Sequence, residues 1–331
     1  MYMILAIDQG SSKTQALIGD EQGAIYGTGL AEGACHFMVG LNRSMEAVRA
    51  AAERAMEMAH VTKDQIQVVS AGMAGANWPE EFQLLTKGLE NLFSPAKVTV
   101  YNDSVPALYA GSQSDNAIIL CAGTSFNAAV LKDRKLVWIY NNYIEMMDDG
   151  GKSLAVRAME GVFRSVTGMG PKTRLMERAM EFFGYQDVLP MLLDFSRNCI
   201  SKPLKDFAMI VDEEAMQGDP VALAAQYDFG ASVSRYATAA IEKYQLTEAD
   251  VVLSGGIFKA RSPVMVDVIR TEVHRIAPKA RIVEAVYEPV VGALELALDQ
   301  QRQQEWWPRL SREAEAFSLV RLDGTGRDTD D

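Results

Sequence analysis

The chain has 331 residues, 48% of them hydrophobic, which is enough for two domains with a core each. Its formal net charge is −12 and its lysines and arginines do not cluster, so it lacks the basic face of a nucleic-acid-binding protein. No apolar run reaches the roughly 18 residues of a membrane span, and the N-terminal residues lack the basic region of a secretory signal. We therefore expect a cytoplasmic protein that binds neither nucleic acid nor membrane.

In the first hundred residues, short apolar segments bounded by turn residues predict strands, and one amphipathic segment predicts a helix. In that helix Met45, Val48, Ala52 and Ala55 recur at three- and four-residue steps, the spacing of one buried helix face. The elements predicted here are strands over 3–7, 15–18 and 24–27, a helix over 44–59, and strands over 67–71 and 97–101.

The same order of elements returns in the second part of the chain: three strands with a small-residue turn after the first, then a helix, then a strand with a glycine-rich end. A duplicated unit explains this order, although strand–turn–strand patterns occur in all α/β proteins. The predicted elements are strands over 118–121, 127–131 and 135–139, a helix from about 153, and a strand over 251–253.

Two further segments differ from this repeat. Residues 168–227 carry Met, Phe and Leu at helical spacing, which predicts an insertion of packed helices. Beyond about residue 300 the chain turns polar and acidic, and we expect the last dozen residues to be disordered. The three cysteines, Cys35, Cys121 and Cys199, lie far apart, which argues against a disulfide framework or a zinc site.

Four predicted strand ends carry residues suited to chemistry: 8–14, 102–103, 123–125 and 254–256. In an open α/β sheet, ligands collect at the carboxyl ends of the strands. Glycine-rich turns with free backbone N–H groups can wrap a polyphosphate, because small side chains let the backbone approach its oxygens. Two such turns at matching positions of two related units predict one nucleotide bound in a cleft between them.

These segments resemble the motifs of the actin-like sugar kinases, in particular the N-acetylglucosamine kinase and BadF/BadG/BcrA/BcrD ATPase family. Residues 8–14 (Asp-Gln-Gly-Ser-Ser-Lys-Thr) and 121–127 (Cys-Ala-Gly-Thr-Ser-Phe-Asn) are similar to its two phosphate motifs. Residues 253–258 are similar to its adenosine motif, and 101–108 to its catalytic-aspartate segment. Segments 217–220 and 288–293 match in order, so the resemblance spans about residues 1–298.

The resemblance implies two actin-like (ribonuclease H-like) lobes, each a mixed sheet flanked by helices, with a nucleotide cleft between them. The expected bounds are 1–112 for the first lobe, 113–298 for the second with its insertion at 168–227, and 299–331 for a C-terminal segment. The implied activity is ATP-dependent phosphorylation of a hydroxyl on a small sugar, most simply an N-acetylated amino sugar such as N-acetylglucosamine. The family also suggests a homodimer.

The resemblance assigns site residues one by one. Asp103 is the implied general base, and Asp8 the residue that holds Mg²⁺, through water. The substrate contacts are Asn102, Asp103, Thr124 and Asp149. The residues expected to bind ATP are Asp8, Gly10, Ser11, Ser12, Lys13, Thr14, Gly123, Thr124, Ser125, Gly255 and Gly256.

Several of these residues have a second interpretation. Asp103 precedes Ser104-Val105-Pro106 and could cap a helix, and Asp149 could belong to the start of the helix near 153. Lys13 could be a solvated lysine at a turn. The sequence also departs from the family on the substrate side: Cys35 stands where a sugar-binding Asn is usual, and residues 148–152 (Asp-Asp-Gly-Gly-Lys) replace Gly-Asp-Glu-Gly-Ser.

Two other functions stay open, and the departures from the family support the second. The first is an ATPase that drives a conformational change in a partner, as the dehydratase activators of this superfamily do, although those proteins share an iron–sulfur cluster through cysteines that this chain does not match. The second is an ATP-binding regulator that kept the fold and lost turnover.

Overall fold

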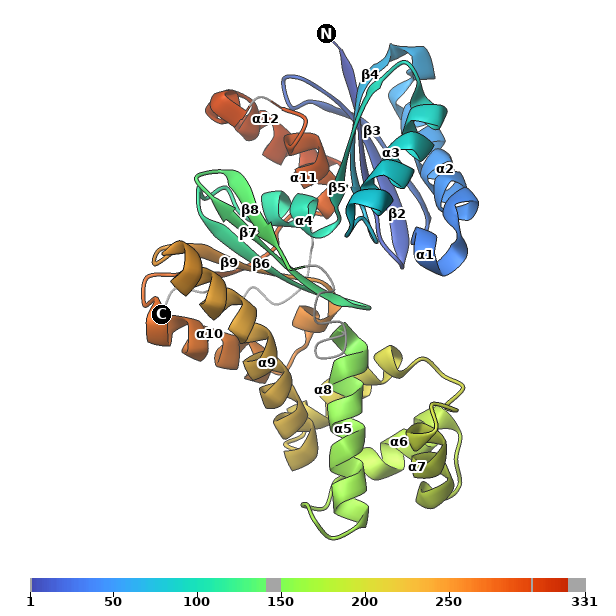
Figure 1. Cartoon of the computed structure of the whole chain (residues 1–331), viewed down its shortest axis with the longest axis vertical. Helices are drawn as coiled ribbons and strands as arrows, with labels where there is room; N and C mark the ends of the chain where they lie inside the picture. The colour runs from blue at the N-terminus through green and yellow to red at the C-terminus, as the bar shows by residue number, and fades with distance from the viewer. Residues whose placement is uncertain (1, 141–149, 299, 321–331) are drawn as a thin grey trace. The chain divides into compact units, whose positions relative to one another are not determined.

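The computed structural model describes residues 2–140, 150–298 and 300–320, and its contacts divide the chain into two compact units. The first unit is discontinuous and combines residues up to 117 with residues from 283 onwards. The second unit comprises residues 118–282. Each unit contains one five-stranded sheet, and each is described by itself below (Figure 1).

The first unit is a mixed sheet with the strand order β3-β2-β1-β4-β5. The central strand β1 pairs antiparallel with β2 and parallel with β4, and β4 pairs parallel with β5. The strands are β1 (Met3–Gln9), β2 (Lys13–Asp20), β3 (Ile25–Glu32), β4 (Ile66–Met73) and β5 (Lys97–Asn102). All five strands predicted for this part of the chain are present, and each is longer than its apolar centre suggested.

Helices cover both faces of this sheet, which explains why β1 is a continuous apolar run rather than an alternating one. On one face, Leu5 and Ile7 join a core with the helices α2 (Leu41–Ala59) and α3 (Pro79–Phe93). On the other face, Ile4 and Ala6 join a core with α11 (Pro289–Glu295) and α12 (Gln303–Ala316). Figure 1 shows the two helix layers on opposite sides of the sheet.

Glycines of β3 let α2 approach the sheet closely. A Cβ atom on Gly29 would lie 2.1 Å from the carbonyl oxygen of Ala51, and one on Gly27 would lie 2.4 Å from that of Ala55. The small residues that α2 presents at these positions are therefore part of a close backbone contact. Two short helices complete the first unit: α1 (His36–Val39) and α4 (Ser104–Gly111).

The second sheet repeats the order of the first, since β8-β7-β6-β9-β10 corresponds to β3-β2-β1-β4-β5. This confirms the predicted repeat at the level of topology. The strands are β6 (Ala117–Ala122), β7 (Phe126–Lys132), β8 (Lys135–Ile139), β9 (Asp250–Ser254) and β10 (Arg281–Glu284). The long helices of this unit are α5 (Gly150–Val166), α9 (Pro220–Tyr244) and α10 (Val264–Ile276).

The expected helical insertion is present in the second unit. Its elements are α6 (Leu175–Phe183), α7 (Val188–Ser196), the 3-10 helix η2 (Leu204–Phe207) and α8 (Ala208–Met216). They share one core cluster with the strands and with α5 and α9, through fully buried residues such as Met191, Phe207 and Val211. Figure 1 shows this helical region at the end of the second unit, away from its strands.

The lobe boundaries differ from the expected ones. Residues 283–298, expected in the second lobe, belong to the first unit, because α11 buries Val290, Val291 and Leu294 against Ile4 and Ala6. Residues 300–320, expected as a separate segment, also belong to this unit through α12. Residues 113–117 belong to the first unit as well. The predicted disorder of the last dozen residues falls almost wholly on 321–331, which lie outside the described residues.

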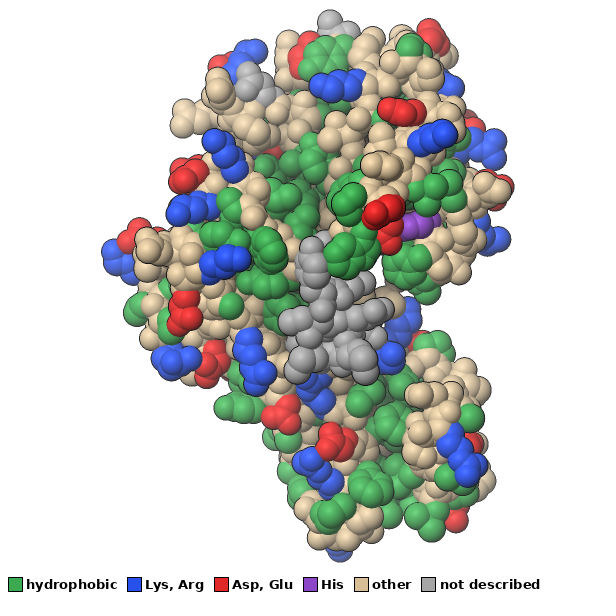
Figure 2. Space-filling model, viewed as in Figure 1, with side chains coloured by type: hydrophobic (Ala, Val, Ile, Leu, Met, Phe, Trp, Pro, Cys, Tyr) green, Lys and Arg blue, Asp and Glu red, His purple; other side chains and the backbone are tan. Residues whose placement is uncertain are grey.

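Acidic and basic side chains are interspersed over the face shown in Figure 2, rather than gathered into single-sign patches. Within the described ranges, none of the helices combines the length and the apolar character needed to cross a lipid bilayer.

Candidate active site

In the first unit, a tight turn joins β1 to β2. It is the first of the two turns expected to bind phosphate, and Gly10–Lys13 is called the first phosphate turn below. The Gly10 N–H donates to the Lys13 carbonyl at 2.9 Å, and the Ala34 N–H donates to the Gly10 carbonyl at 3.2 Å. Ser12 is exposed, while Gly10 and Ser11 are half-buried. The turn is therefore held by its own backbone and remains accessible to a ligand.

Gly33 fixes the position of this turn from the other side. A Cβ atom at Gly33 would lie 2.4 Å from backbone atoms of Ser11 and Ser12, so no larger residue fits here without moving the turn. The sequence motif did not identify Gly33, because it lies about twenty residues away, at the end of β3. In the sequence, Gly33 is one of many glycines, and nothing distinguishes it from the others.

The residues that flank the turn are buried. The side chain of Asp8, at the end of β1, is 6% exposed. Thr14 is fully buried, and its hydroxyl donates to the Glu32 carbonyl at 2.7 Å. The Thr14 hydroxyl therefore supports the β2–β3 pairing, which is a different role from the expected phosphate contact.

Lys13 lies beside an acidic residue from the other end of the chain. Its Nζ forms an ion pair with Glu288 Oε2 at 2.5 Å and a hydrogen bond with Gln15 Oε1 at 3.4 Å. The Lys13 side chain is 42% exposed and that of Glu288 is 20% exposed. Glu288 directly precedes α11, so the closure of the first unit by α11 brings this carboxylate to the first phosphate turn.

Strand register brings Asp103 to the same sheet edge as the first phosphate turn. Along the parallel strands β1, β4 and β5, Gln9 pairs with Met73, and Met73 pairs with Asn102. The carboxyl ends of β1, β4 and β5 therefore lie side by side at one edge of the sheet. Neighbouring strands lie about 4.8 Å apart, so β1 and β5 are separated by roughly 10 Å. Asp103 follows β5 directly, so it lies at the same sheet edge as the first phosphate turn.

The Asn102 side chain holds the Asp103 segment in place. Its Oδ1 accepts hydrogen bonds from the Ser104 N–H at 3.0 Å and from the Ser104 hydroxyl at 2.5 Å. Its Nδ2 donates to the Ala76 carbonyl and to Asn77 Oδ1. Asn102 is 1% exposed, and all its polar atoms have protein partners. Its geometry therefore fits positioning better than the expected contact with a substrate.

Asp103 precedes α4 but makes no side-chain capping hydrogen bond to that helix. The alternative interpretation of Asp103 as a helix cap therefore lacks the contact that defines a cap. Burial raises the pKa of Asp103 to about 6, although the backbone N–H groups of Ser104 and Asp103 oppose this rise. A carboxylate with a pKa near 6 is a better proton acceptor than an ordinary aspartate and is still ionised at pH 7.

Cys35 lies near Asp103 at the start of α1. It is 1% exposed and its Sγ donates to the Ala74 carbonyl at 3.3 Å. Burial raises the pKa of the Cys35 thiol to about 11, and the carboxylates of Asp103 and Glu81 add to this rise. The thiol is therefore protonated and committed to the protein backbone, so it offers a substrate neither a nucleophile nor a strong hydrogen-bond partner.

In the second unit, the loop Gly123–Ser125 lies between β6 and β7. It is the second turn expected to bind phosphate and is called the second phosphate turn below. The Gly123 N–H donates to the Ser125 carbonyl at 2.9 Å, and the Gly151 N–H, in the first turn of α5, donates to the Gly123 carbonyl at 3.0 Å. A Cβ atom at Gly123 would meet nothing within 4 Å. The space above this glycine is open, as a backbone cradle for phosphate oxygens requires.

A lysine that sequence reasoning missed reaches this turn. Lys205 Nζ, from η2, lies 3.3 Å from the Thr124 hydroxyl. The motif search could not identify Lys205, because it lies 81 residues beyond Thr124 in the helical insertion. No local spacing connects the two residues.

The two glycines after β9 lie in different surroundings. Gly255 has a φ of +100°, and a Cβ atom there would lie 2.2 Å from the Ala122 carbonyl oxygen. Gly255 therefore allows the loop after β9 to touch the end of β6. Gly256 is exposed, and a Cβ atom there would meet nothing within 4 Å. Of the two, Gly256 is the one that leaves open space for a ligand.

Asp149, the remaining expected substrate contact, lies outside the described residues, as does the Asp148 beside it. Among the residues that the structure describes, no group of three or more His, Cys, Asp and Glu side chains is placed to hold a metal ion. A single buried carboxylate such as Asp8 still fits Mg²⁺, which commonly keeps several waters and takes its remaining ligands from substrate phosphates.

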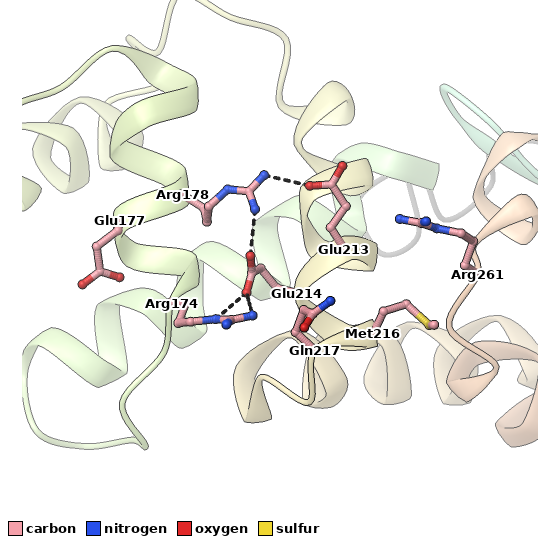
Figure 3. Close-up of a pocket in the computed structure, with 8 residues that line it drawn as sticks. All are labelled: Arg174, Glu177, Arg178, Glu213, Glu214, Met216, Gln217 and Arg261. Carbon is pink, nitrogen blue, oxygen red and sulfur yellow. Dashed lines mark hydrogen bonds and ion pairs between the residues drawn. The ribbon is translucent and has the colours of Figure 1, made fainter.

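A separate pocket of about 700 Å³ lies in the second unit between the insertion and the segment after β9 (Figure 3). Four of its charged side chains, Arg174, Arg178, Glu213 and Glu214, are paired with one another. Glu214, whose side chain is 4% exposed, binds Arg174 at 2.6 Å and Arg178 at 2.8 Å, and Arg178 also binds Glu213 at 2.7 Å. Because these arginines are committed to carboxylates, the pocket is a poor candidate for a polyphosphate, and none of the expected site residues lines it.

Comparison with known proteins identifies the family. The sequence model of the BadF/BadG/BcrA/BcrD ATPase family matches residues 5–297. No curated protein matches the chain in sequence.

Solved structures share the fold. A proposed N-acetylglucosamine kinase from Porphyromonas gingivalis has a TM-score of 0.64 at 18% identity, over 92% of this chain and 98% of that one. One from Chromobacterium violaceum has a TM-score of 0.65 at 17% identity, over 89% and 99% of the two chains. A ROK family glucokinase from Streptomyces griseus, in complex with glucose and AMPPNP, has a TM-score of 0.60 at 17% identity, over 89% and 98%. These similarities show that the expected two-lobed fold is present.

Proposed function

The chain belongs to the BadF/BadG/BcrA/BcrD ATPase family, and from this membership we propose that it is an ATP-dependent kinase that phosphorylates a hydroxyl group of a small sugar. One observation carries the proposal: the register of β1, β4 and β5 places the first phosphate turn and the half-buried Asp103 at one edge of one sheet. A phosphoryl-transfer site needs a donor-binding turn and a proton acceptor within reach of each other.

In this proposal, each unit has its own backbone and hydroxyl groups that suit ATP phosphates. In the first unit they belong to Gly10–Ser12. In the second unit they belong to Gly123–Ser125, and Gly256 offers open space in the loop after β9. Bound Mg²⁺ would supply charge neutralisation for the phosphate oxygens, and Asp8 would hold it through water. Lys13 would contribute its charge once its ion pair with Glu288 loosens.

Asp103 acts as the general base. Its carboxylate accepts the proton of the attacking sugar hydroxyl while that oxygen forms a bond to the γ-phosphorus of ATP. The bond between the γ-phosphorus and the bridging oxygen breaks, and ADP leaves with its electron pair. Asn102 positions Asp103 through the Ser104 hydrogen bonds. The pKa of about 6 leaves Asp103 ionised and ready to accept this proton at neutral pH.

For the acceptor we propose an N-acetylated amino sugar such as N-acetylglucosamine. Two of the solved structures that share the fold are proposed N-acetylglucosamine kinases. The Cys35 thiol, bonded to the Ala74 carbonyl, cannot replace the amide of an asparagine as a sugar partner. A polar site that lacks one hydrogen-bond partner discriminates differently among sugars, so the panel of acceptors tested must be broad.

The experiment is coupled ADP release with Mg-ATP and a panel of N-acetylglucosamine, glucosamine, N-acetylmuramic acid, N-acetylmannosamine and glucose. We expect ADP release that depends on one of the amino sugars. If the protein binds ATP in calorimetry but no sugar stimulates ADP release, the sugar-kinase proposal is wrong. An ATP-binding regulator, or an ATPase that acts on a partner, would then be the better description.

A further inference from the structure

We propose that Lys205, in the helical insertion, binds the polyphosphate of the nucleotide at the second phosphate turn. This inference rests on the proposed function and adds a residue to it that no sequence motif contains. The Lys205 Nζ lies 3.3 Å from the Thr124 hydroxyl. An ammonium group and a hydroxyl that converge beside an open glycine turn are the groups that phosphate oxygens bind.

The backbone of Lys205 packs against Gly151 in the first turn of α5, which also contacts the other two loops. A Cβ atom at Gly151 would lie 3.2 Å from the Lys205 carbonyl oxygen and 3.4 Å from the Lys205 Cβ. The same atom would lie 3.2 Å from Ile257, which directly follows Gly256. Gly151 itself donates to the Gly123 carbonyl. Lys205 thus lies where the second phosphate turn, the first turn of α5 and the loop after β9 converge.

Aromatic packing makes this position rigid. Phe207, two residues after Lys205, is fully buried, with its ring centroid 5.7 Å from that of Phe182 and 5.3 Å from that of Phe183. η2 is therefore anchored in the core of the insertion. The lysine at its surface is half-buried, so its side chain has less rotamer freedom to lose when it binds a ligand.

The charge of Lys205 also distinguishes it from the arginines Arg174 and Arg178 of the insertion. Arg174 and Arg178 are neutralised by Glu214 and Glu213. Among the described ranges of the chain, no carboxylate forms an ion pair with Lys205. A half-buried cation beside an open glycine turn is suited to an anionic ligand.

The test is the affinity of the full-length protein for adenosine, Mg-ADP and Mg-ATP, measured by calorimetry for the wild type and for Lys205→Met. We expect Lys205→Met to weaken Mg-ADP and Mg-ATP binding roughly 10- to 100-fold, the usual effect of losing a charge-assisted hydrogen bond. Adenosine affinity should be unchanged. Lys205→Arg, which keeps the charge, should retain more affinity than Lys205→Met.

A matched control is Lys172→Met, which removes an exposed lysine from the same insertion and should change none of the three affinities. The salt dependence of Mg-ATP binding should be shallower in Lys205→Met than in the wild type, because one charge contact is gone. This measurement separates a charge effect from a folding defect.

Three results would overturn the inference. Lys205→Met could bind Mg-ATP as the wild type does, or it could lose adenosine and Mg-ATP affinity equally, or it could keep the wild-type salt dependence. Failure of the proposed function has a different signature. A wild type that binds Mg-ATP without sugar-dependent ADP release refutes the kinase and leaves the Lys205 test intact, whereas a wild type that binds no Mg-ATP refutes both.

Discussion

At the scale of single residues, Asp103 is the proposed general base. It follows β5 at the sheet edge that carries the first phosphate turn, and burial raises its pKa to about 6. The Asn102 side chain accepts hydrogen bonds from the Ser104 N–H and from the Ser104 hydroxyl. The Asp103 carboxylate makes no capping bond to α4, which leaves it suited to a proton from a substrate.

We predict that Asp103→Asn lowers kcat by roughly 10²- to 10⁴-fold, the usual contribution of a general base, and leaves the Kd for ATP nearly unchanged. Steady-state kinetics and calorimetry with ATP check the two parts. Asp115→Asn, which changes an exposed aspartate near the end of the N-terminal segment of the first unit, is the control and should behave as the wild type. Unchanged turnover in Asp103→Asn would remove Asp103 from the mechanism.

The raised pKa of Asp103 predicts the pH dependence of the reaction. The base must be deprotonated, so kcat/KM should rise tenfold per pH unit below about pH 6 and level off above it. An ordinary aspartate, with a pKa near 3.8, would give a plateau already at pH 5. The measurement is kcat/KM with the best acceptor from pH 4.5 to 8, and a flat profile between pH 4.5 and 6 would contradict the assignment.

The ion pair between Lys13 and Glu288 predicts a change in nucleotide affinity. Both side chains are partly exposed, and such pairs contribute about 0–1 kcal/mol. Glu288→Gln removes the competing carboxylate, so we expect Mg-ATP to bind up to about fivefold more tightly. Lys13→Met should weaken Mg-ATP binding. Calorimetry on both variants provides the test, and weaker binding by Glu288→Gln would mean that Glu288 assists the nucleotide.

At the scale of elements, the first unit depends on a close crossing between α4 and α11. A Cβ atom at Gly292 would lie 1.9 Å from the Pro106 carbonyl oxygen and 2.7 Å from the Ala110 nitrogen. Both obstacles are backbone atoms, which cannot rotate away as a side chain can. The crossing also determines the path of α11, and thereby brings Glu288 to Lys13.

Gly292→Ala should therefore destabilise the protein by about 1–3 kcal/mol or more, the range for overpacking in a rigid core. Urea unfolding monitored by circular dichroism measures this loss. Gly88→Ala in α3 is the matched control, because a Cβ atom there meets the flexible end of Met45. The control should be neutral or slightly stabilising, since alanine favours a helix over glycine. Equal stability of the two variants would show that α4 and α11 move apart enough to accommodate the added methyl group.

At the scale of the whole molecule, the C-terminal part completes the N-terminal fold. α12 buries Trp306, Leu310 and Ala314 in the core that contains Ile4 and Leu17. A chain that ends at residue 298 lacks these side chains. It should lose at least about 3 kcal/mol of unfolding free energy, since losing one buried tryptophan side chain costs that much. A chain that ends at residue 320 keeps α12 and is the control. Thermal unfolding of the two truncated chains measures the predicted difference in stability.

The sequence by itself determined much of the local structure. Apolar runs and turn residues predicted all five strands of the first sheet and four of the second, and the repeated order of elements predicted matching sheet topologies. These features depend on neighbours in the chain, which a periodicity captures. The strand β10 was missed, because Arg281–Glu284 is short and begins and ends with charged residues. The family motifs identified the turns at Gly10–Lys13 and Gly123–Ser125, because each motif is also a run of neighbouring residues.

Contacts between distant segments were decided only by the tertiary structure. Gly33 beside Ser11, Glu288 beside Lys13 and Lys205 beside Thr124 join residues that are 22, 275 and 81 positions apart. The burial of α11 and α12 in the first unit likewise moved the lobe boundary from the expected 298 to 282. The physical reason is the same in each case. A local pattern reports which face of an element is apolar, whereas only packing decides which distant element covers that face and which polar groups it brings along.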